Sequence, residues 1–134
     1  MKEITAVIRM EKIGSTKKAL LDIGIPGFTA FKAEGRGRLV TDKNLLAKRK
    51  LSIVSMNSAN SGSDVLMTEF VNGTKIFPCR VIIVLAADKD ADKIIRAIIG
   101  ANRTDYGIGD GKIFVAPLDE TIRVRTRETG DAAL

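Results

Sequence analysis

An almost continuous apolar run at residues 79–86, Cys-Arg-Val-Ile-Ile-Val-Leu-Ala, constrains the fold more than any other feature. Such a run is typical of a strand with both faces buried, so it predicts the centre of a sheet. Asp88 and Asp90 follow at once, and acidic side chains favour the first turn of a helix. The helix is expected to bury Ala91, Ile94, Ile95 and Ile98, which recur at helical spacing. A strand over residues 112–116 then completes a strand–helix–strand unit.

A second unit of the same kind occupies the beginning of the chain. Residues 4–10 are rich in β-branched side chains and predict a strand. A helix follows and is expected to end at Gly24, since glycine is common just past a helix terminus. Its buried face is expected to hold Ile13, Thr16, Leu20 and Ile23. Residues 28–33 alternate in polarity and predict the next strand.

Two such units predict an α+β fold, a ferredoxin-like βαββαβ sandwich with one sheet and both helices on one face. Residues 121–126 alternate apolar and arginine side chains, which predicts an extra C-terminal strand, and residues 127–134 are expected to be a polar tail. The length suits a single domain over residues 1–134. The second face of the sheet would be left open, so we expect self-association to cover it.

The stretch between the two units, about residues 37–78, is expected to be a long inserted loop. It begins with Gly-Arg-Gly-Arg at 35–38, where guanidinium groups beside a flexible backbone would suit a phosphate or carboxylate. A solvated basic turn is the alternative interpretation. Residues 55–64 are rich in Ser, Asn and Gly, and the Asn-Gly pair at 72–73 indicates a tight turn. Loops of this length inside a compact domain are usually functional or disordered.

A glycine-rich segment precedes the last strand of the second unit: residues 107–115 read Gly-Ile-Gly-Asp-Gly-Lys-Ile-Phe-Val. Glycines let backbone N–H groups turn toward an anion, and Lys112 can add positive charge to a phosphate chain. The segment is not a Walker A loop, since Tyr106 and Ile113 stand where that loop needs Gly and Ser or Thr. It is not a dinucleotide fingerprint, because no helix pattern follows. Taken alone, it is equally well interpreted as a plain turn.

The composition narrows the function classes. The absence of His removes His-based metal sites and the usual general base, and the single Cys79 fits a reducing compartment. The net charge of +6 fits anionic partners, but aromatic residues make up only 4% and do not interleave with basic ones. A base-stacking nucleic-acid surface is therefore poorly supported. Without a membrane-span or signal-peptide pattern, a cytoplasmic location is expected.

Four segments resemble the P-II signal-transduction family: residues 1–4, residues 24–29 leading to 35–38, residues 104–115, and Ile-Arg-Val-Arg-Thr at 122–126. The resemblance covers nearly all of the chain except about residues 39–78. It implies a homotrimer, or a trimer with related P-II subunits, that binds ATP or ADP between neighbouring subunits. It also implies a target protein in nitrogen metabolism, no catalytic residues, and contact with a membrane only through a transporter.

The resemblance assigns particular residues to the nucleotide. It places Gly109, Asp110, Gly111 and Lys112 in a loop that cradles phosphates. It matches Thr29, Gly35, Gly37 and Arg38 to positions on the same nucleotide, and Arg123 and Arg125 to a pair that reaches the phosphates from the adjacent subunit. Four cationic side chains and glycine N–H groups would then converge on one polyphosphate.

Several departures argue against the family's usual 2-oxoglutarate and Mg²⁺ site. Leu39 replaces a Gln that helps hold both, and Cys79 replaces a Lys that pairs with a 2-oxoglutarate carboxylate. A further departure argues against uridylylation. Some members carry the modified Tyr in the long loop, whereas the only Tyr of this chain, Tyr106, lies outside it. The family also has one residue fewer between a Thr, here Thr104, and the Gly-Asp-Gly-Lys motif. Asp105-Tyr106-Gly107 occupies that place in this chain, so the beginning of the loop is expected to be reshaped.

A basic triplet in the effector or target loop, Lys48, Arg49 and Lys50, could supply the missing positive charge. Residues 8–10 and 16–20 also resemble the nitrogenase-associated subgroup of the family. We therefore expect a non-catalytic regulator in which adenine nucleotide sets the conformation of the long loop, with nitrogenase as one candidate target. The alternatives are a diverged sensor of another small anion that regulates a transporter or biosynthetic enzyme, a slow ATP-hydrolysing enzyme, and a nucleic-acid binder with strongly salt-dependent binding.

Overall fold

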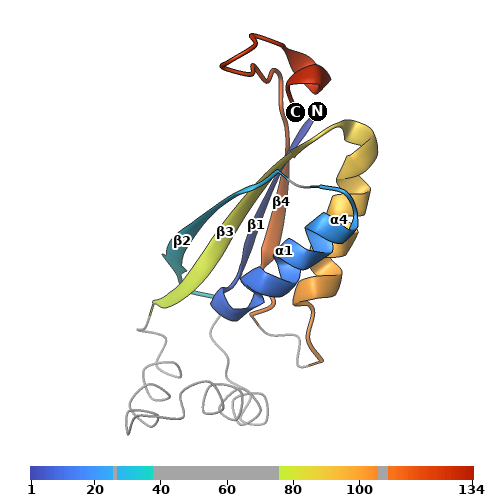
Figure 1. The fold of residues 1–134 in the computed structure, drawn as a ribbon. Helices are drawn as coiled ribbons and strands as arrows, with labels where there is room; N and C mark the ends of the chain where they lie inside the picture. The colour runs from blue at the N-terminus through green and yellow to red at the C-terminus, as the bar shows by residue number, and fades with distance from the viewer. Residues whose placement is uncertain (26, 38–75, 106–108) are drawn as a thin grey trace, which may run out of the picture.

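Four strands form one antiparallel sheet, and two helices cover one of its faces (Figure 1). The computed structural model describes residues 1–25, 27–37, 76–105 and 109–134. Its strands are β1 (Lys2–Arg9), β2 (Thr29–Gly35), β3 (Phe77–Ala86) and β4 (Lys112–Pro117), and its helices are α1 (Ile13–Asp22) and α4 (Asp88–Asn102). Two 3₁₀ helices, η1 (Met10–Lys12) and η2 (Gly130–Ala133), complete the described elements. The strand order β2-β3-β1-β4 is that of the predicted ferredoxin-like sandwich.

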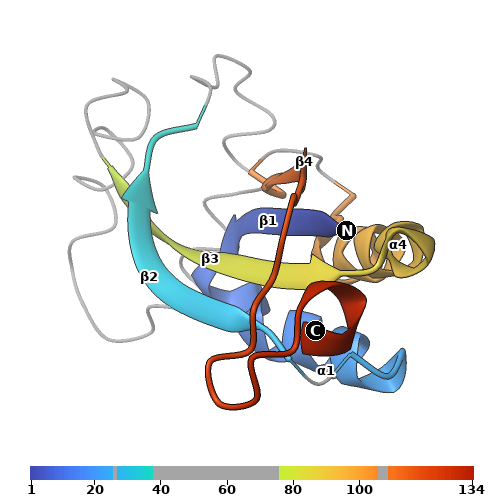
Figure 2. The same cartoon turned by 90° about the horizontal axis from the view of Figure 1, so that it is seen from above.

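The core lies between the two central strands and the helices. In the antiparallel register, Ile4 lies opposite Val84 and Ala6 opposite Ile82, and all four side chains are buried. The helices α1 and α4 contact each other above this layer, as the view from above in Figure 2 shows. They contribute Leu20, Ala91, Ile94 and Ile98 to the same core cluster. The helical spacing seen in the sequence therefore identified the buried faces correctly.

The other face of the sheet carries exposed apolar side chains. Because side chains alternate along a strand, the partners of the core positions place Phe31, Leu85 and Phe114 on the face away from the helices. Phe31 is 46% exposed and Phe114 is 55% exposed. An open apolar face was predicted from the element order, and the structure confirms it.

The predicted elements differ from the observed ones mainly at their ends. The strand β3 begins at Phe77, two residues before the apolar run, and β2 extends to Gly35. Gly24 follows α1 with a φ of +81°, a conformation that glycine adopts without strain. Among the helices of the described ranges, none is long and apolar enough to cross a membrane.

The extra C-terminal strand predicted for residues 121–126 is wrong. The chain turns back on itself there, and the Arg127 N–H donates to the Arg123 carbonyl at 2.8 Å. Only an isolated bridge joins Ile122 to Thr129. The alternation in the sequence concerned side chains alone, whereas a strand also needs a partner strand for its backbone hydrogen bonds. Here those bonds close locally.

The segment predicted as a polar tail, residues 127–134, is mostly exposed, and it also has local structure. The Gly130 N–H donates to the Thr121 carbonyl at 3.0 Å, and the chain then forms η2. Backbone bonds of this kind close within residues 121–134, so they order a short polar segment without an apolar pattern to reveal it. Residues 121–134 thus form a C-terminal turn that lies beyond the end of the sheet (Figure 1).

Candidate functional site

The glycine-rich segment enters β4 through a tight approach to β1. Gly109 has a φ of +69° and Gly111 a φ of +105°, both in the left-handed region that favours glycine. A Cβ on Gly111 would overlap the carbonyl oxygen of Val7, so no other residue fits there without a shift of the backbone. Lys112 follows directly and lies opposite Val7 as the first residue of β4.

The carboxylate of Asp110 holds this segment together. Its Oδ2 accepts a hydrogen bond from the Thr104 backbone N–H at 3.0 Å, and its Oδ1 accepts one from the Thr104 hydroxyl at 2.6 Å. The Arg9 guanidinium donates to the same Oδ1 at 2.7 Å. Asp110 therefore ties the chain just after α4 and the end of β1 to the glycines that precede β4.

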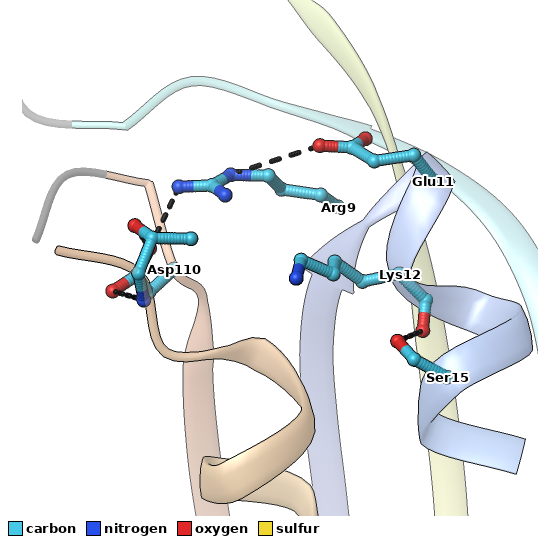
Figure 3. Close-up of polar contacts among 6 residues, drawn as sticks. Arg9, Glu11, Lys12, Ser15 and Asp110 are labelled. Carbon is cyan, nitrogen blue, oxygen red and sulfur yellow. Dashed lines mark hydrogen bonds and ion pairs between the residues drawn. The ribbon is translucent and has the colours of Figure 1, made fainter. Parts of the chain in front are cut away.

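The Arg9 side chain lies between two carboxylates at the end of β1. Figure 3 shows its guanidinium directed at Asp110 on one side and at Glu11 on the other, where Nε and Oε1 are 4.0 Å apart. The Arg9 side chain is only 9% exposed, and that of Asp110 is 23% exposed. Burial by itself raises the pKa of Asp110, but the hydrogen bonds from Thr104 and the charge of Arg9 outweigh it and lower this pKa below its ordinary value.

The predicted residues of β2 lie at the opposite edge of the sheet. Thr29 begins β2, Gly35 ends it, and Gly37 follows. Two strands separate β2 from β4, and at an interstrand spacing of about 4.8 Å the two edges are about 14 Å apart. In the register of the sheet, Lys112 lies level with Phe31 of β2, two positions along that strand from Thr29 and four from Gly35.

The predicted arginine pair lies at the far end of the molecule. The strand β4 carries the chain about 17 Å from Lys112 to Pro117, and the C-terminal turn begins beyond it (Figure 1). Arg123 donates to the Glu128 carboxylate at 2.8 Å and to the Leu134 carbonyl at 3.0 Å, and Arg125 is exposed in the turn. One chain therefore does not bring this pair to Gly109, Asp110, Gly111 and Lys112.

Other predicted positions lie outside the described residues. These are Arg38, Leu39, Lys48, Arg49, Lys50 and Tyr106. Cys79 is described and lies half-buried in β3, in register with Arg9 on one side and Ala33 on the other. Within the described ranges, no group of three or more acidic or Cys side chains gathers in a way that could hold a metal ion.

Sequence reasoning missed two residues of the loop network, Arg9 and Thr104. Arg9 was placed in the first strand and in a stretch that resembles the nitrogenase-associated subgroup, but its partner Asp110 lies 101 positions away. Only the pairing of β1 with β4 brings the two together. Thr104 began a segment that resembles the family, but nothing in its spacing from Asp110 indicated the bond between the two side chains.

Behind the loop, a groove of about 470 Å³ runs between α4 and β4. Its walls are apolar, with Ile95, Ile99 and Val115 among them, and Asp110 and Lys112 border it. Asn102 also lines the groove, and its buried amide donates to the Thr16 hydroxyl at 2.9 Å, which joins α4 to α1. Asp110, Gly111 and Lys112 therefore lie beside α4, which is packed on α1.

The fold and the loop together define a class of protein. It is a small ferredoxin-like domain with a glycine-rich loop at one edge of the sheet and an arginine pair in a turn at the far end. The family model for "Nitrogen regulatory protein P-II" matches residues 1–128. The chain belongs to the P-II family, whose members are regulatory signalling proteins that act as oligomers on partner proteins of nitrogen metabolism.

Similar proteins carry names from nitrogen fixation and nitrogen regulation. A "Nitrogen fixation nifHD1 region GlnB-like protein 2" of Methanosarcina barkeri is 39% identical over all of this chain and 99% of its own length. A "Nitrogen fixation nifHD region GlnB-like protein 2" of Methanobacterium ivanovii is 36% identical over all of this chain and 99% of its own length. A "Nitrogen regulatory protein P-II 2" of Methanothermobacter thermautotrophicus is 32% identical over all of this chain and 97% of its own. These names agree with the predicted nitrogenase-associated subgroup.

Proposed function

We propose that the protein binds ATP or ADP at a site shared between subunits, and that the bound nucleotide controls its association with a target protein. One observation carries the proposal: groups suited to phosphate lie at opposite ends of one chain, with Lys112 at one end and Arg123 and Arg125 at the other. They cannot meet on one polyphosphate within a chain. They would meet in a symmetric ring in which the loop end of one copy faces the C-terminal turn of the next.

The loop itself has the chemistry that a polyphosphate requires. The positive φ angles of Gly109 and Gly111 turn successive peptide groups, and N–H groups presented in this way form a concave anion site. Lys112 is exposed beside them and supplies a mobile positive charge. Among the groups near the loop, Asp110 already has its charge matched by Arg9, so it repels an incoming anion less.

The open face of the sheet supports the assembly that the shared site requires. Phe31, Leu85 and Phe114 would be buried if the sheets of several copies faced one another, and apolar burial is the main driving force of stable association. A closed ring of three copies is the form that we propose, with the loop end and the C-terminal turn of adjacent copies in contact.

Regulation then follows from differential affinity. A nucleotide shifts a conformational equilibrium only if it binds one state more tightly than the other. We propose that this equilibrium belongs to the long loop, about residues 37–78, which the structure leaves outside the described residues for the most part. The target that we propose belongs to nitrogen metabolism, and the "nifHD region" names of the relatives support nitrogenase as the first candidate.

Calorimetric titration with ATP, ADP and AMP tests the proposal. We expect wild type to bind ATP or ADP and Lys112→Ala to weaken that binding by roughly 10- to 100-fold, since a charge-assisted hydrogen bond contributes about 1.5–3 kcal/mol. Lys17→Ala, an exposed lysine of α1, is the matched control and should leave the affinity unchanged. No binding by wild type would overturn the proposed function.

Mixed assemblies test whether the site is shared. Lys112→Ala and Arg125→Ala should each impair every site in a homo-oligomer. Refolding the two variants together should restore sites that combine an intact loop with an intact turn from the neighbour. If binding does not recover while mixed oligomers form, the two residues do not act on one nucleotide across an interface.

A second candidate function is a diverged sensor of another small anion that regulates a transporter or a biosynthetic enzyme. The position of Cys79 favours it, because a thiol stands in register with Arg9 where the family resemblance expects a lysine. Repeating the titration with 2-oxoglutarate and Mg²⁺ separates the two. Nucleotide binding that 2-oxoglutarate strengthens would show that the effector site is retained by another route, and the absence of any effect would favour the diverged sensor.

A further inference from the structure

We propose that Asp110 is a positioning residue. With Arg9 and Thr104 it holds residues 109–112, the glycine loop, in the shape that binds the anion, and it makes no contact with the bound anion. The inference rests on the proposed function, because it concerns the same loop. It differs from the family resemblance, which groups Asp110 with the phosphate-cradling residues.

Both carboxylate oxygens of Asp110 are already engaged within the chain. Oδ1 accepts from the Thr104 hydroxyl and from Arg9, and Oδ2 accepts from the Thr104 backbone N–H. Turning this carboxylate toward a phosphate would break three hydrogen bonds and place two negative charges side by side. The geometry therefore leaves ligand contact to the neighbouring glycine N–H groups and to Lys112.

The network joins three elements that are distant in sequence. Thr104 follows the end of α4, Arg9 ends β1, and Asp110 lies between the two glycines of positive φ. On the other side of Asp110, the backbone at Gly111 presses against Val7, which also belongs to β1. The loop is thus fastened to β1 twice, once by an ion pair and once by close backbone contact.

Partial burial makes this fastening effective. The Arg9 side chain is 9% exposed, so the pair is screened by solvent less than a surface ion pair is. A loop held in its bound shape before the ligand arrives loses less conformational entropy on binding. Removing a bond of this network is therefore expected to weaken ligand binding. This applies also to the Thr104 hydroxyl, which bonds to Asp110 and not to the ligand.

The test measures ADP affinity by calorimetry in full-length variants at one position of the network. Thr104→Val removes the hydroxyl and keeps the shape of the side chain, and we expect it to weaken ADP binding about tenfold, which corresponds to the loss of one charge-assisted hydrogen bond. Thr104→Ser restores the hydroxyl and should return the affinity to within about twofold of wild type. Both variants should remain folded at the titration temperature, because the buried core cluster does not involve this hydroxyl.

A double-mutant cycle with Asp110→Asn tests whether Thr104 and Asp110 act on ligand affinity as one unit. If Asp110 acts through the network, Thr104→Val should cost less affinity in the Asp110→Asn background than in wild type, because only a neutral hydrogen bond to the amide oxygen is then left to lose. Asp88→Asn is the matched control, since it removes an exposed carboxylate that pairs with Lys2 and the N-terminal ammonium at the other end of the sheet.

The outcomes distinguish this inference from the proposed function. Unchanged ADP affinity in Thr104→Val, or fully additive losses in the double variant, would overturn the positioning role. If Asp110→Asn does not fold, the comparison of Thr104→Val with Thr104→Ser decides alone. Failure of wild type to bind any nucleotide would overturn the proposed function itself.

Discussion

Two arginine–carboxylate pairs mark the two ends of the sheet, and they differ in burial more than in geometry. Arg9 donates to Asp110 at 2.7 Å and Arg123 donates to Glu128 at 2.8 Å. The side chains of the first pair are 9% and 23% exposed, whereas those of the second are 42% and 46% exposed. Similar distances therefore do not imply similar roles.

The difference shows which arginine is free to change its partner. Breaking a partly buried pair leaves a poorly solvated charge, while an exposed pair contributes about 0–1 kcal/mol because water replaces either partner. Arg123 can therefore exchange Glu128 for another anion at little cost, whereas Arg9 holds Asp110. On the proposed function, the loop end is the fixed half of the site and the C-terminal turn is the adaptable half.

The largest expected effect on stability comes from adding a side chain at Gly111, where the loop meets β1. Gly111→Ala would force a Cβ against the Val7 carbonyl at a φ of +105°, and we expect the free energy of unfolding to fall by about 3 kcal/mol. Urea denaturation measures it. Gly100→Ala is the control, because a Cβ there meets nothing within 4 Å and alanine favours a helix interior. A loss below about 1 kcal/mol for Gly111→Ala would mean that the loop end is not rigid.

A smaller effect should come from the charge that holds the loop. Burial raises the pKa of Asp110, the bonds from Thr104 and Arg9 lower it more, and the net pKa lies below the ordinary 3.8. A lowered pKa in the folded state means that the charged form contributes stability. This contribution is complete above the unfolded pKa and is lost as the pH falls through the folded one.

Asp110→Asn should therefore reduce the free energy of unfolding by about 1–2 kcal/mol at pH 7, and the difference from wild type should shrink below about pH 4. Urea denaturation at several pH values measures both. A difference that persists undiminished at low pH would show that the contribution does not come from the carboxylate charge.

The smallest effect on stability is expected at the exposed pair. Glu128→Gln should change the free energy of unfolding by less than about 0.5 kcal/mol, because the pair is well solvated. It should strengthen nucleotide binding about two- to threefold, since Arg123 would no longer have a competing carboxylate. Weaker binding in Glu128→Gln would indicate that Glu128 aligns Arg123 for the ligand, and the contrast between the two ends would then disappear.

Much of the fold could be predicted because periodicity is a local property. The apolar run at 79–86 identified β3, and the spacing of Leu20, Ile94 and Ile98 identified the helix faces that are buried. The glycine loop was also predicted, since repeated glycines indicate a backbone that needs positive φ angles. The C-terminal segment was predicted wrongly, because residues 121–126 had the alternation of a strand and no partner strand to pair with.

The sequence alone determined that the chain is a ferredoxin-like P-II domain with a glycine loop before its last strand. Each of these features was recognised from patterns and motifs of residues that are close together in the sequence. Only the tertiary structure decided how the loop is held. Arg9 and Asp110 are 101 positions apart, and their ion pair exists because β1 pairs with β4. The same structure separated Lys112 from Arg123 along the length of a strand, a distance that no local pattern in the sequence encodes.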